Sequence, residues 1–184
     1  MGPQGSGKGT QAKLIAEARA VPHVATGDIL RAAVAEGTEL GRRVQPLLEA
    51  GDLVPDELMV ALIRERLADE DGFVLDGFPR TLHQALELDA MLDEIEKPLD
   101  AVLLLEVSDE VSTQRMRGRA ELEGRTDDTP ETIAKRLRLY HELTKPVVER
   151  YRGSGVLVAI DGEQTVEAVT AAIEAALERV EAAS

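Results

Sequence analysis

The sequence contains no cysteine and no tryptophan, and aromatic residues make up only 2% of its 184 residues. The lack of cysteine excludes disulfide bonds and cysteine-ligated zinc sites. Because aromatic side chains are so few, the core has to be built from aliphatic residues, which a hydrophobic content of 43% can supply. The length is that of one main domain.

Long apolar runs are also absent. No segment approaches the roughly 20 residues that a membrane-spanning helix needs. The first residues are rich in glycine, whereas a secretory signal is basic and then apolar. We therefore expect a cytoplasmic protein with no membrane partner.

Positive charge is scarce, with a net charge of −14 at pH 7, which argues against a nucleic-acid partner. One segment departs from this balance: residues 115–138 hold seven basic side chains and five acidic ones. A locally positive segment in an acidic chain suggests a small, highly charged anion as ligand. The basic residues are Arg115, Arg117, Arg119, Arg125, Lys135, Arg136 and Arg138.

Apolar strand patterns alternate with helical patterns along the chain. Strands are expected at 22–25, 73–76, 101–107 and 156–160, and Thr129-Pro130 and Thr165 resemble helix starts. The last three apolar runs are continuous rather than alternating, which indicates burial on both faces. We predict an α/β fold with three layers (α/β/α) and a parallel sheet. Ligands bind beyond the carboxyl ends of the strands in such sheets, where Asp76, Ser108 and Asp161 fall.

The opening residues, MGPQGSGKGT, fit the phosphate-binding pattern G-x-x-x-x-G-K, known as the P-loop. The glycines allow successive amide groups to point at phosphate oxygens, and Lys8 adds a positive charge. The following helix presents its N-terminus to the anion. Gly9 stands where the strict pattern has Ser or Thr, and Thr10 follows, so a direct hydroxyl contact to Mg²⁺ stays open.

A second motif, LDGFPRTLHQA, follows the strand pattern that ends at Asp76. A carboxylate there can hold Mg²⁺ through water, or it can simply cap a helix. Arg80 can grip phosphate with two parallel hydrogen bonds. Gln84, one helical turn later, offers a donor and an acceptor suited to an adenine edge, or is a solvated surface residue. TGDILR at 26–31 alone indicates no more than a helix start.

Taken together, these motifs resemble the adenylate kinase family across essentially the whole chain. The matching segments are the glycine loop, TGDILR, AGDLVPDEL, DGFPRT, and GRTDD followed by KRL. The resemblance implies reversible phosphoryl transfer from Mg-ATP to AMP, giving two ADP. It implies one kinase domain over 1–184, with an AMP-binding arm at 26–55 and a lid loop at 119–128. Only AELEG separates Arg119 from Arg125, which resembles the family's short form without zinc.

The resemblance also implies roles by position. The residues that neutralise charge during transfer, and are expected to be catalytic, are Lys8, Arg80, Arg119, Arg125 and Arg136. The ATP site would comprise Gly5, Ser6, Gly7, Lys8, Gly9, Thr10, Arg115, Arg119 and Gln164. The AMP site would comprise Thr26, Gly27, Arg31, Val54, Gly77, Arg80, Gln84, Arg125 and Arg136. Asp76 would hold Mg²⁺ through water, and Asp127 and Asp128 resemble lid aspartates that pair with arginines on closure.

Three other functions compete with this one. A UMP or CMP kinase is the nearest, although Thr26 and Gln84 favour adenine. A catalytically impaired nucleotide-binding protein is a second. A P-loop hydrolase switch is poorly supported, because no water-positioning motif is evident. The histidines His23, His83 and His141 form no metal-spaced cluster and are expected at the surface or in the core.

Only Met1 precedes the glycine loop, whereas the family has a central strand there. The resemblance implies five strands, and this chain predicts four. Three explanations compete: the sequence begins late, the strand was removed by design, or residues 73–76 pair directly with 101–107. We expect a monomer unless another chain supplies a strand.

Overall fold

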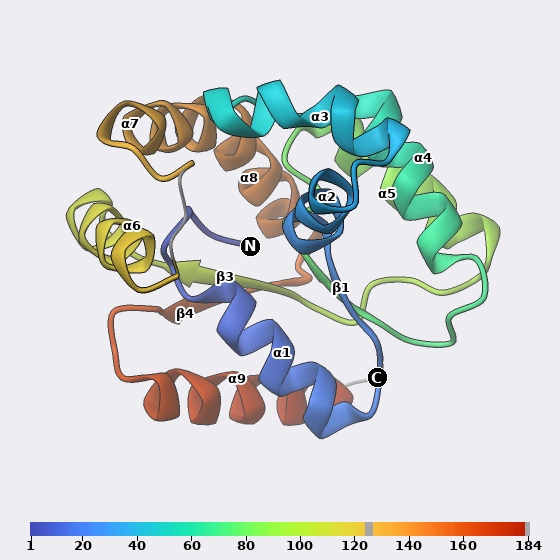
Figure 1. The fold of residues 1–184 in the computed structure, drawn as a ribbon. Coiled ribbons are helices and arrows are strands. Elements are labelled where there is room, and N and C mark those ends of the chain that lie inside the picture. Colours follow the sequence, from blue (N-terminus) through green and yellow to red (C-terminus); the bar gives the residue numbers. More distant parts are fainter. Residues whose placement is uncertain (124–126, 183–184) are drawn as a thin grey trace.

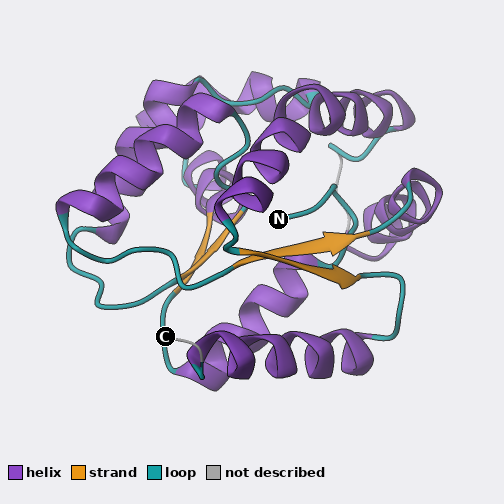
Figure 2. Cartoon of the chain, turned by 180° about the vertical axis from the view of Figure 1, so that it is seen from behind, coloured by secondary structure: helices purple, strands orange, loops and turns teal. Residues whose placement is uncertain are grey.

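The computed structural model describes residues 1–123 and 127–182. Within these ranges four short strands lie between helices, as Figures 1 and 2 show. The strands are β1 (His23–Ala25), β2 (Val74–Asp76), β3 (Val102–Glu106) and β4 (Leu157–Asp161). Each lies in a segment whose apolar pattern predicts a strand, so the α/β fold class is confirmed.

The strands form two parallel pairs. β1 pairs with β2, with Val24 opposite Leu75, and β3 pairs with β4, with Leu104 opposite Ala159. No ladder joins β2 to β3 in the described ranges, so the interpretation in which these segments pair directly is wrong.

Met1 is hydrogen-bonded to β3. Its carbonyl accepts a hydrogen bond from the Leu105 amide at 3.0 Å, and its amino group donates to the Leu103 carbonyl. Met1 therefore pairs with β3, on the edge that β4 does not occupy, in the manner of a parallel strand. A cavity of about 560 Å³ lies between the pairs, lined in part by Val74, Leu75 and Leu103.

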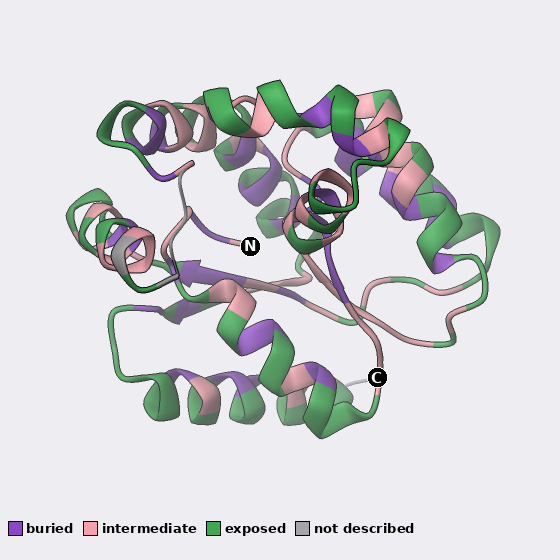
Figure 3. Cartoon of the chain, in the orientation of Figure 1, coloured by how far each residue is buried: buried purple, intermediate pink, exposed green. Residues whose placement is uncertain are grey.

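Helices cover both faces of the strands (Figure 1). On one face lie α1 (Lys8–Arg19) and α9 (Val166–Glu181), and the core there joins Leu105, Ile160 and Ile173. On the other face lie α5 (Leu82–Glu94) and α8 (Lys145–Ser154), with a core that includes Val102 and Val147. Figure 3 shows buried residues on the helix faces that turn toward the strands. This is the predicted order of layers.

A further group of helices packs beside β1 and β2: α2 (Thr26–Ala35), α3 (Glu39–Ala50) and α4 (Asp56–Leu67). Their core includes Val44 and Ile63, neither of which is exposed. α2 and α3 cross very closely, since a Cβ at Gly41 would lie 2.0 Å from the Ala33 carbonyl oxygen. The predicted arm 26–55 corresponds to α2, α3 and the loop before α4.

The remaining helices are α6 (Asp109–Glu123), α7 (Pro130–Leu139) and a π-helical turn, η1 (Tyr140–Thr144), that leads into α8. The helix starts predicted at Thr129 and Thr165 are confirmed. Each hydroxyl accepts a hydrogen bond from the amide three residues later, at 3.2 and 3.3 Å. None of the helices in the described ranges combines the length and apolarity needed to cross a membrane.

Candidate active site

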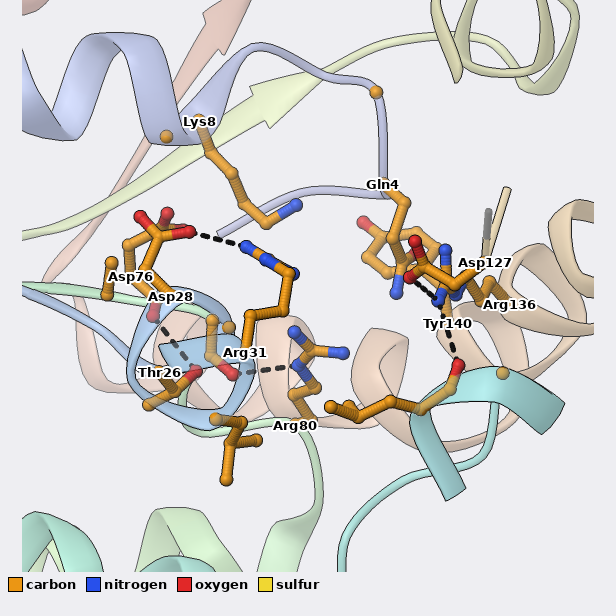
Figure 4. A pocket seen from close by; sticks show the side chains of 18 of the residues that line it. Gln4, Lys8, Thr26, Asp28, Arg31, Asp76, Arg80, Asp127, Arg136 and Tyr140 are labelled. Carbon is orange, nitrogen blue, oxygen red and sulfur yellow. Dashed lines mark hydrogen bonds and ion pairs between the residues drawn. The ribbon is translucent and has the colours of Figure 1, made fainter. Parts of the chain in front are cut away.

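A cavity of about 710 Å³ opens where β1 and β2 end and α1 begins. Figure 4 shows Lys8, Arg31, Arg80 and Arg136 pointing into it from separate elements. Most of the residues predicted for the site line this cavity: Gly5, Gly7, Lys8, Gly9, Thr10, Thr26, Gly27, Arg31, Val54, Asp76, Gly77, Arg80, Gln84, Arg115, Arg119, Asp127 and Arg136. The fold thus brings the sequence motifs to one place.

Three residues of the predicted ATP and AMP sites stand apart from this set. Ser6 is 2% exposed and does not line the cavity. Gln164 also lies outside the lining and donates a hydrogen bond to Asp161 Oδ2 at 2.7 Å. Arg125, together with part of the predicted lid at 119–128, lies outside the described residues.

The glycine loop is closely packed and ends in a free helix N-terminus. Gly5 has a φ of 82°, and a Cβ there would lie 2.6 Å from the Ser112 carbonyl oxygen, so the loop contacts α6 directly. Gly7, with a φ of 88°, precedes α1, and no side chain caps that helix. The first amide groups of α1 are therefore available to an anion.

Lys8 lies inside this loop. Its Nζ donates a hydrogen bond to the Pro3 carbonyl at 3.1 Å. Burial lowers the pKa of Lys8 to about 8, although the nearby Asp76 carboxylate opposes the shift. Arg80 and Arg119 lower the pKa further. Lys8 is thus a half-buried cation whose charged form an additional negative charge would stabilise.

β2 ends in a tight turn that places Arg80. The Thr26 hydroxyl donates to the Asp76 carbonyl at 3.2 Å, and a Cβ on Gly77 would lie only 2.5 Å from that hydroxyl. Arg80 Nε donates to the Gly77 carbonyl at 2.7 Å. Burial lowers the pKa of Arg80; Asp76 opposes this, and Arg136 and Arg31 reinforce it. Three arginines therefore raise the positive potential of one cavity.

Gln84 is held by two partners. Its side chain is 2% exposed, its Oε1 accepts a hydrogen bond from the Arg80 amide at 2.7 Å, and its Nε2 donates to Asp56 Oδ1 at 2.8 Å. The prediction that Gln84 faces the site rather than solvent is consistent with this burial.

Asp127 and Asp128 form ion pairs with one arginine from α6, Arg119, and one from α7, Arg136. The Asp128 side chain is fully buried and accepts hydrogen bonds from Arg119 Nε at 3.0 Å and from Arg136. Asp127 accepts from Arg136 at 2.6 Å. Although burial raises the pKa of Asp127, its hydrogen bond with Arg136 and the charge of that guanidinium hold the pKa below its usual value. Arg115 donates to the Gly162 carbonyl at 2.8 Å.

Two residues that lie next to predicted site residues had no site role in the sequence analysis. His23 Nε2 lies 3.9 Å from Asp76 Oδ2, because the pairing of β1 with β2 brings the two strands together. Asp56 contacts Gln84 from α4. The only signal for Asp56 was its place in the AGDLVPDEL segment, two residues after Val54.

The described residues contain no group of three or more His, Cys, Asp or Glu side chains that could hold a metal ion. The Asp76 carboxylate faces the cavity near the start of α1, where a Cβ on Gly9 would lie 3.2 Å from Oδ2. Mg²⁺ is often bound by one or two carboxylates together with substrate phosphates. Asp76 fits that mode of binding.

Comparison with known proteins agrees with this geometry. The chain matches the family model described as adenylate kinase over residues 1–156. It is 51% identical to an adenylate kinase of Thermus thermophilus, over 96% of this chain and 94% of the relative. It is 52% identical to one from a Cyanothece species, over 94% and 90%. A third, from Stenotrophomonas maltophilia, is 44% identical over 96% of each chain.

Proposed function

The chain belongs to the adenylate kinase family, and from this premise we propose how its residues transfer a phosphoryl group from ATP to AMP. The observation that carries the proposal is the convergence of Lys8, Arg31, Arg80, Arg119 and Arg136 on one cavity. These five cationic side chains come from four helices and a loop. Such a cluster suits the phosphates of two nucleotides that face each other.

We assign the ATP phosphates to the glycine loop. The amide groups of residues 5–10 and the N-terminus of α1 would bind the phosphate oxygens, with Lys8 as the half-buried counter-charge. Arg115 and Arg119 would contact the same phosphates from α6.

We assign AMP to the opposite side of the cavity. Arg31 and Arg80 would hold its phosphate, while Thr26, Val54 and Gln84 would contact the base. Arg136 lies beside both Arg80 and Asp127 and would contact the transferred group. Arg125 keeps its proposed role at the transferred group on the strength of the motif alone.

This arrangement needs no nucleophile or general base. The acceptor phosphate is already an oxyanion, so positioning and charge neutralisation account for catalysis. Mg²⁺ that arrives with ATP supplies neutralisation of the β- and γ-phosphate charge, and Asp76 is the residue that would hold it through water. Closure of the arm 26–55 and the lid 119–128 would exclude water from the reacting phosphates. We also propose that the protein is a cytoplasmic monomer.

A coupled ATP–AMP assay with and without Mg²⁺ tests the proposal. Arg80→Ala should lower kcat/KM for AMP by a factor of about 10² to 10³, as removal of one preorganised charge-stabilising donor does elsewhere. Arg64→Ala is the matched control, because Arg64 is half exposed and pairs with Glu94 away from the cavity. UMP, CMP and GMP are assayed in parallel, and faster turnover of CMP than of AMP would reject the assignment of the acceptor.

A further inference from the structure

We propose that Asp56 is a positioning residue for the acceptor base, acting through Gln84. It fixes which way the Gln84 carboxamide faces, and so decides which pattern of donors and acceptors the base meets. The inference rests on the role of Gln84 in the proposed function. It extends that function to discrimination between 6-aminopurine and 6-oxopurine nucleotides.

The contacts join the first turns of two helices. Asp56 opens α4, and its Oδ1 accepts from Gln84 Nε2 at 2.8 Å. Its Oδ2 accepts from the hydroxyl of Thr81, also at 2.8 Å. The same hydroxyl accepts a hydrogen bond from the backbone N–H of Gln84 at 3.2 Å and so caps α5. Asp56 is therefore held in place by the helix start that carries Gln84.

The chemistry of the two partners determines the carboxamide orientation. A carboxylate only accepts hydrogen bonds, and a backbone N–H only donates them. The nitrogen of Gln84 must therefore face Asp56, and its oxygen must face the Arg80 amide at 2.7 Å. In the flipped orientation, Gln84 Oε1 would face the Asp56 carboxylate, so two acceptors would meet. Its Nε2 would face the Arg80 backbone N–H, so two donors would meet. Because Gln84 is 2% exposed, water cannot satisfy either clash.

The fixed carboxamide of Gln84 presents its remaining donor and acceptor in one defined order. Nε2 keeps one hydrogen and Oε1 keeps one lone pair, and the residue lines the cavity. An adjacent donor and acceptor complement a purine edge that carries an unprotonated ring nitrogen beside an amino group. A 6-oxopurine presents the reverse pattern, with a ring N–H beside a carbonyl. A fixed orientation accepts the first edge and rejects the second.

Asp56→Asn tests this role, because it preserves the shape of the side chain while allowing the neighbouring amide to turn. AMP and IMP are compared as acceptors under saturating ATP. We expect KM for AMP to rise about tenfold, the effect of one good hydrogen bond, with little change in kcat. The ratio of kcat/KM for AMP over IMP should fall about tenfold, while KM for ATP stays within twofold of the parent value.

Glu57→Gln is the matched control. Glu57 is exposed and lies beside Asp56 in the first turn of α4. The substitution therefore removes the same charge from the same helix turn. It should leave both KM for AMP and the AMP-to-IMP ratio unchanged. If both variants lower the ratio equally, the effect comes from helix charge and the positioning role is rejected.

Gln84→Met separates the two levels of the inference. If it impairs use of AMP while Asp56→Asn behaves like the parent protein, positioning by Asp56 is rejected and the role of Gln84 stands. If Gln84→Met leaves the kinetics of AMP and IMP unchanged, the proposed role of Gln84 is itself wrong. A lower melting temperature for Asp56→Asn with an unchanged ratio would assign Asp56 a structural role only.

Should Asp56→Asn fail to fold, side-chain amide NMR on the unmodified protein answers the same question. The Nε2 protons of Gln84 should exchange slowly with water, and their resonances should shift when AMP is added. Rapid exchange with water, with no response of these resonances to AMP, would show that Asp56 does not hold the carboxamide and would overturn the proposal.

Discussion

The carboxylate of Asp128 is fully buried and forms a two-point hydrogen bond with the guanidinium of Arg119, at 3.0 Å from Nε and 2.7 Å from the terminal nitrogen. Arg136 donates to the other oxygen of the same carboxylate. One aspartate thus pairs with two arginines that we assign to the phosphates. Its negative charge lies between these two cations and reduces their mutual repulsion.

Asp128→Ala should therefore destabilise the protein while leaving the arginines in reach of phosphate. We expect the free energy of unfolding to fall by about 3 kcal/mol, the lower end of the range for breaking a buried ion pair, since Arg119 is 27% exposed. Urea unfolding measures it. Asp109→Ala, which removes an exposed partner of His141, is the control and should cost less than about 1 kcal/mol. A smaller loss for Asp128→Ala than for Asp109→Ala would contradict this account.

The lowered pKa of Lys8 predicts that the affinity for ATP decreases at high pH. Burial lowers its pKa to about 8, so the nucleotide-free protein loses this positive charge as the pH rises through 8. The affinity for ATP should fall between pH 7 and pH 9.5, as measured by titration calorimetry. Lys8→Met should bind weakly and with little dependence on pH across this interval. A parallel fall in both proteins would assign the effect to another group.

The same pKa has the opposite effect on stability. The unfolded chain keeps the ordinary lysine pKa of 10.5, so between pH 8 and 10.5 it binds a proton that the folded protein does not. This group therefore makes the free energy of unfolding of the nucleotide-free protein rise with pH across that interval. Comparison with Lys8→Met by urea unfolding isolates its share, and equal pH slopes for the two proteins would refute it.

Gly77→Ala should damage both the turn after β2 and the AMP side of the cavity. Gly77 has a φ of 84°, and a new Cβ would lie 2.5 Å from the Thr26 hydroxyl. We expect a loss of about 1–3 kcal/mol in the free energy of unfolding, because the strained backbone conformation is forced on alanine. KM for AMP should also rise, since the Gly77 carbonyl accepts from Arg80 Nε.

Gly153→Ala provides the control for this substitution. Gly153 lies within α8, and a Cβ there meets no atom within 4 Å. Alanine is favoured over glycine inside a helix, so stability should stay the same or increase slightly. Similar losses in both variants would mean that glycine at 77 is not needed for its conformation.

Much of the site could be predicted from the sequence because its residues lie in local motifs. The glycine loop, the end of β2 and the start of α5 each carry their chemistry within about ten residues. Parallel topology then brings the carboxyl ends of the strands to one edge. Arg31, Arg80 and Arg136 meet there, although they come from three distant segments.

The relations that escaped prediction depend on contacts between distant segments. Asp56 meets Gln84 only because α4 packs against α5. His23 meets Asp76 only through the register of β1 with β2. Apolar patterns identified the strands correctly but could not decide their pairing, because a strand buried on both faces carries no signal for its neighbours. The separation of β2 from β3 belongs to this class.

That separation gives the last prediction. Five β-branched apolar residues added before Gly2 should enter the cavity of about 560 Å³ between β2 and β3 as a parallel strand. Met1 already bonds to Leu103 and Leu105 as such a strand would. Each buried residue contributes about 1.5–3 kcal/mol, against about 1–2 kcal/mol per residue for ordering the backbone. A net gain of a few kcal/mol is expected, with a higher melting temperature.

The added strand should also raise turnover. The strand would run directly into Gly2 and so fix the start of the glycine loop against β3. Gly2 already packs closely there, since a Cβ on it would lie 2.7 Å from the Leu105 carbonyl oxygen. An extension of the same length made of Gly and Ser is the control, because it lengthens the chain without apolar side chains to bury. Equal melting temperature and turnover for the apolar extension, the control and the parent would contradict the prediction. A higher melting temperature with unchanged turnover would mean that Met1 alone already holds the loop in its working position.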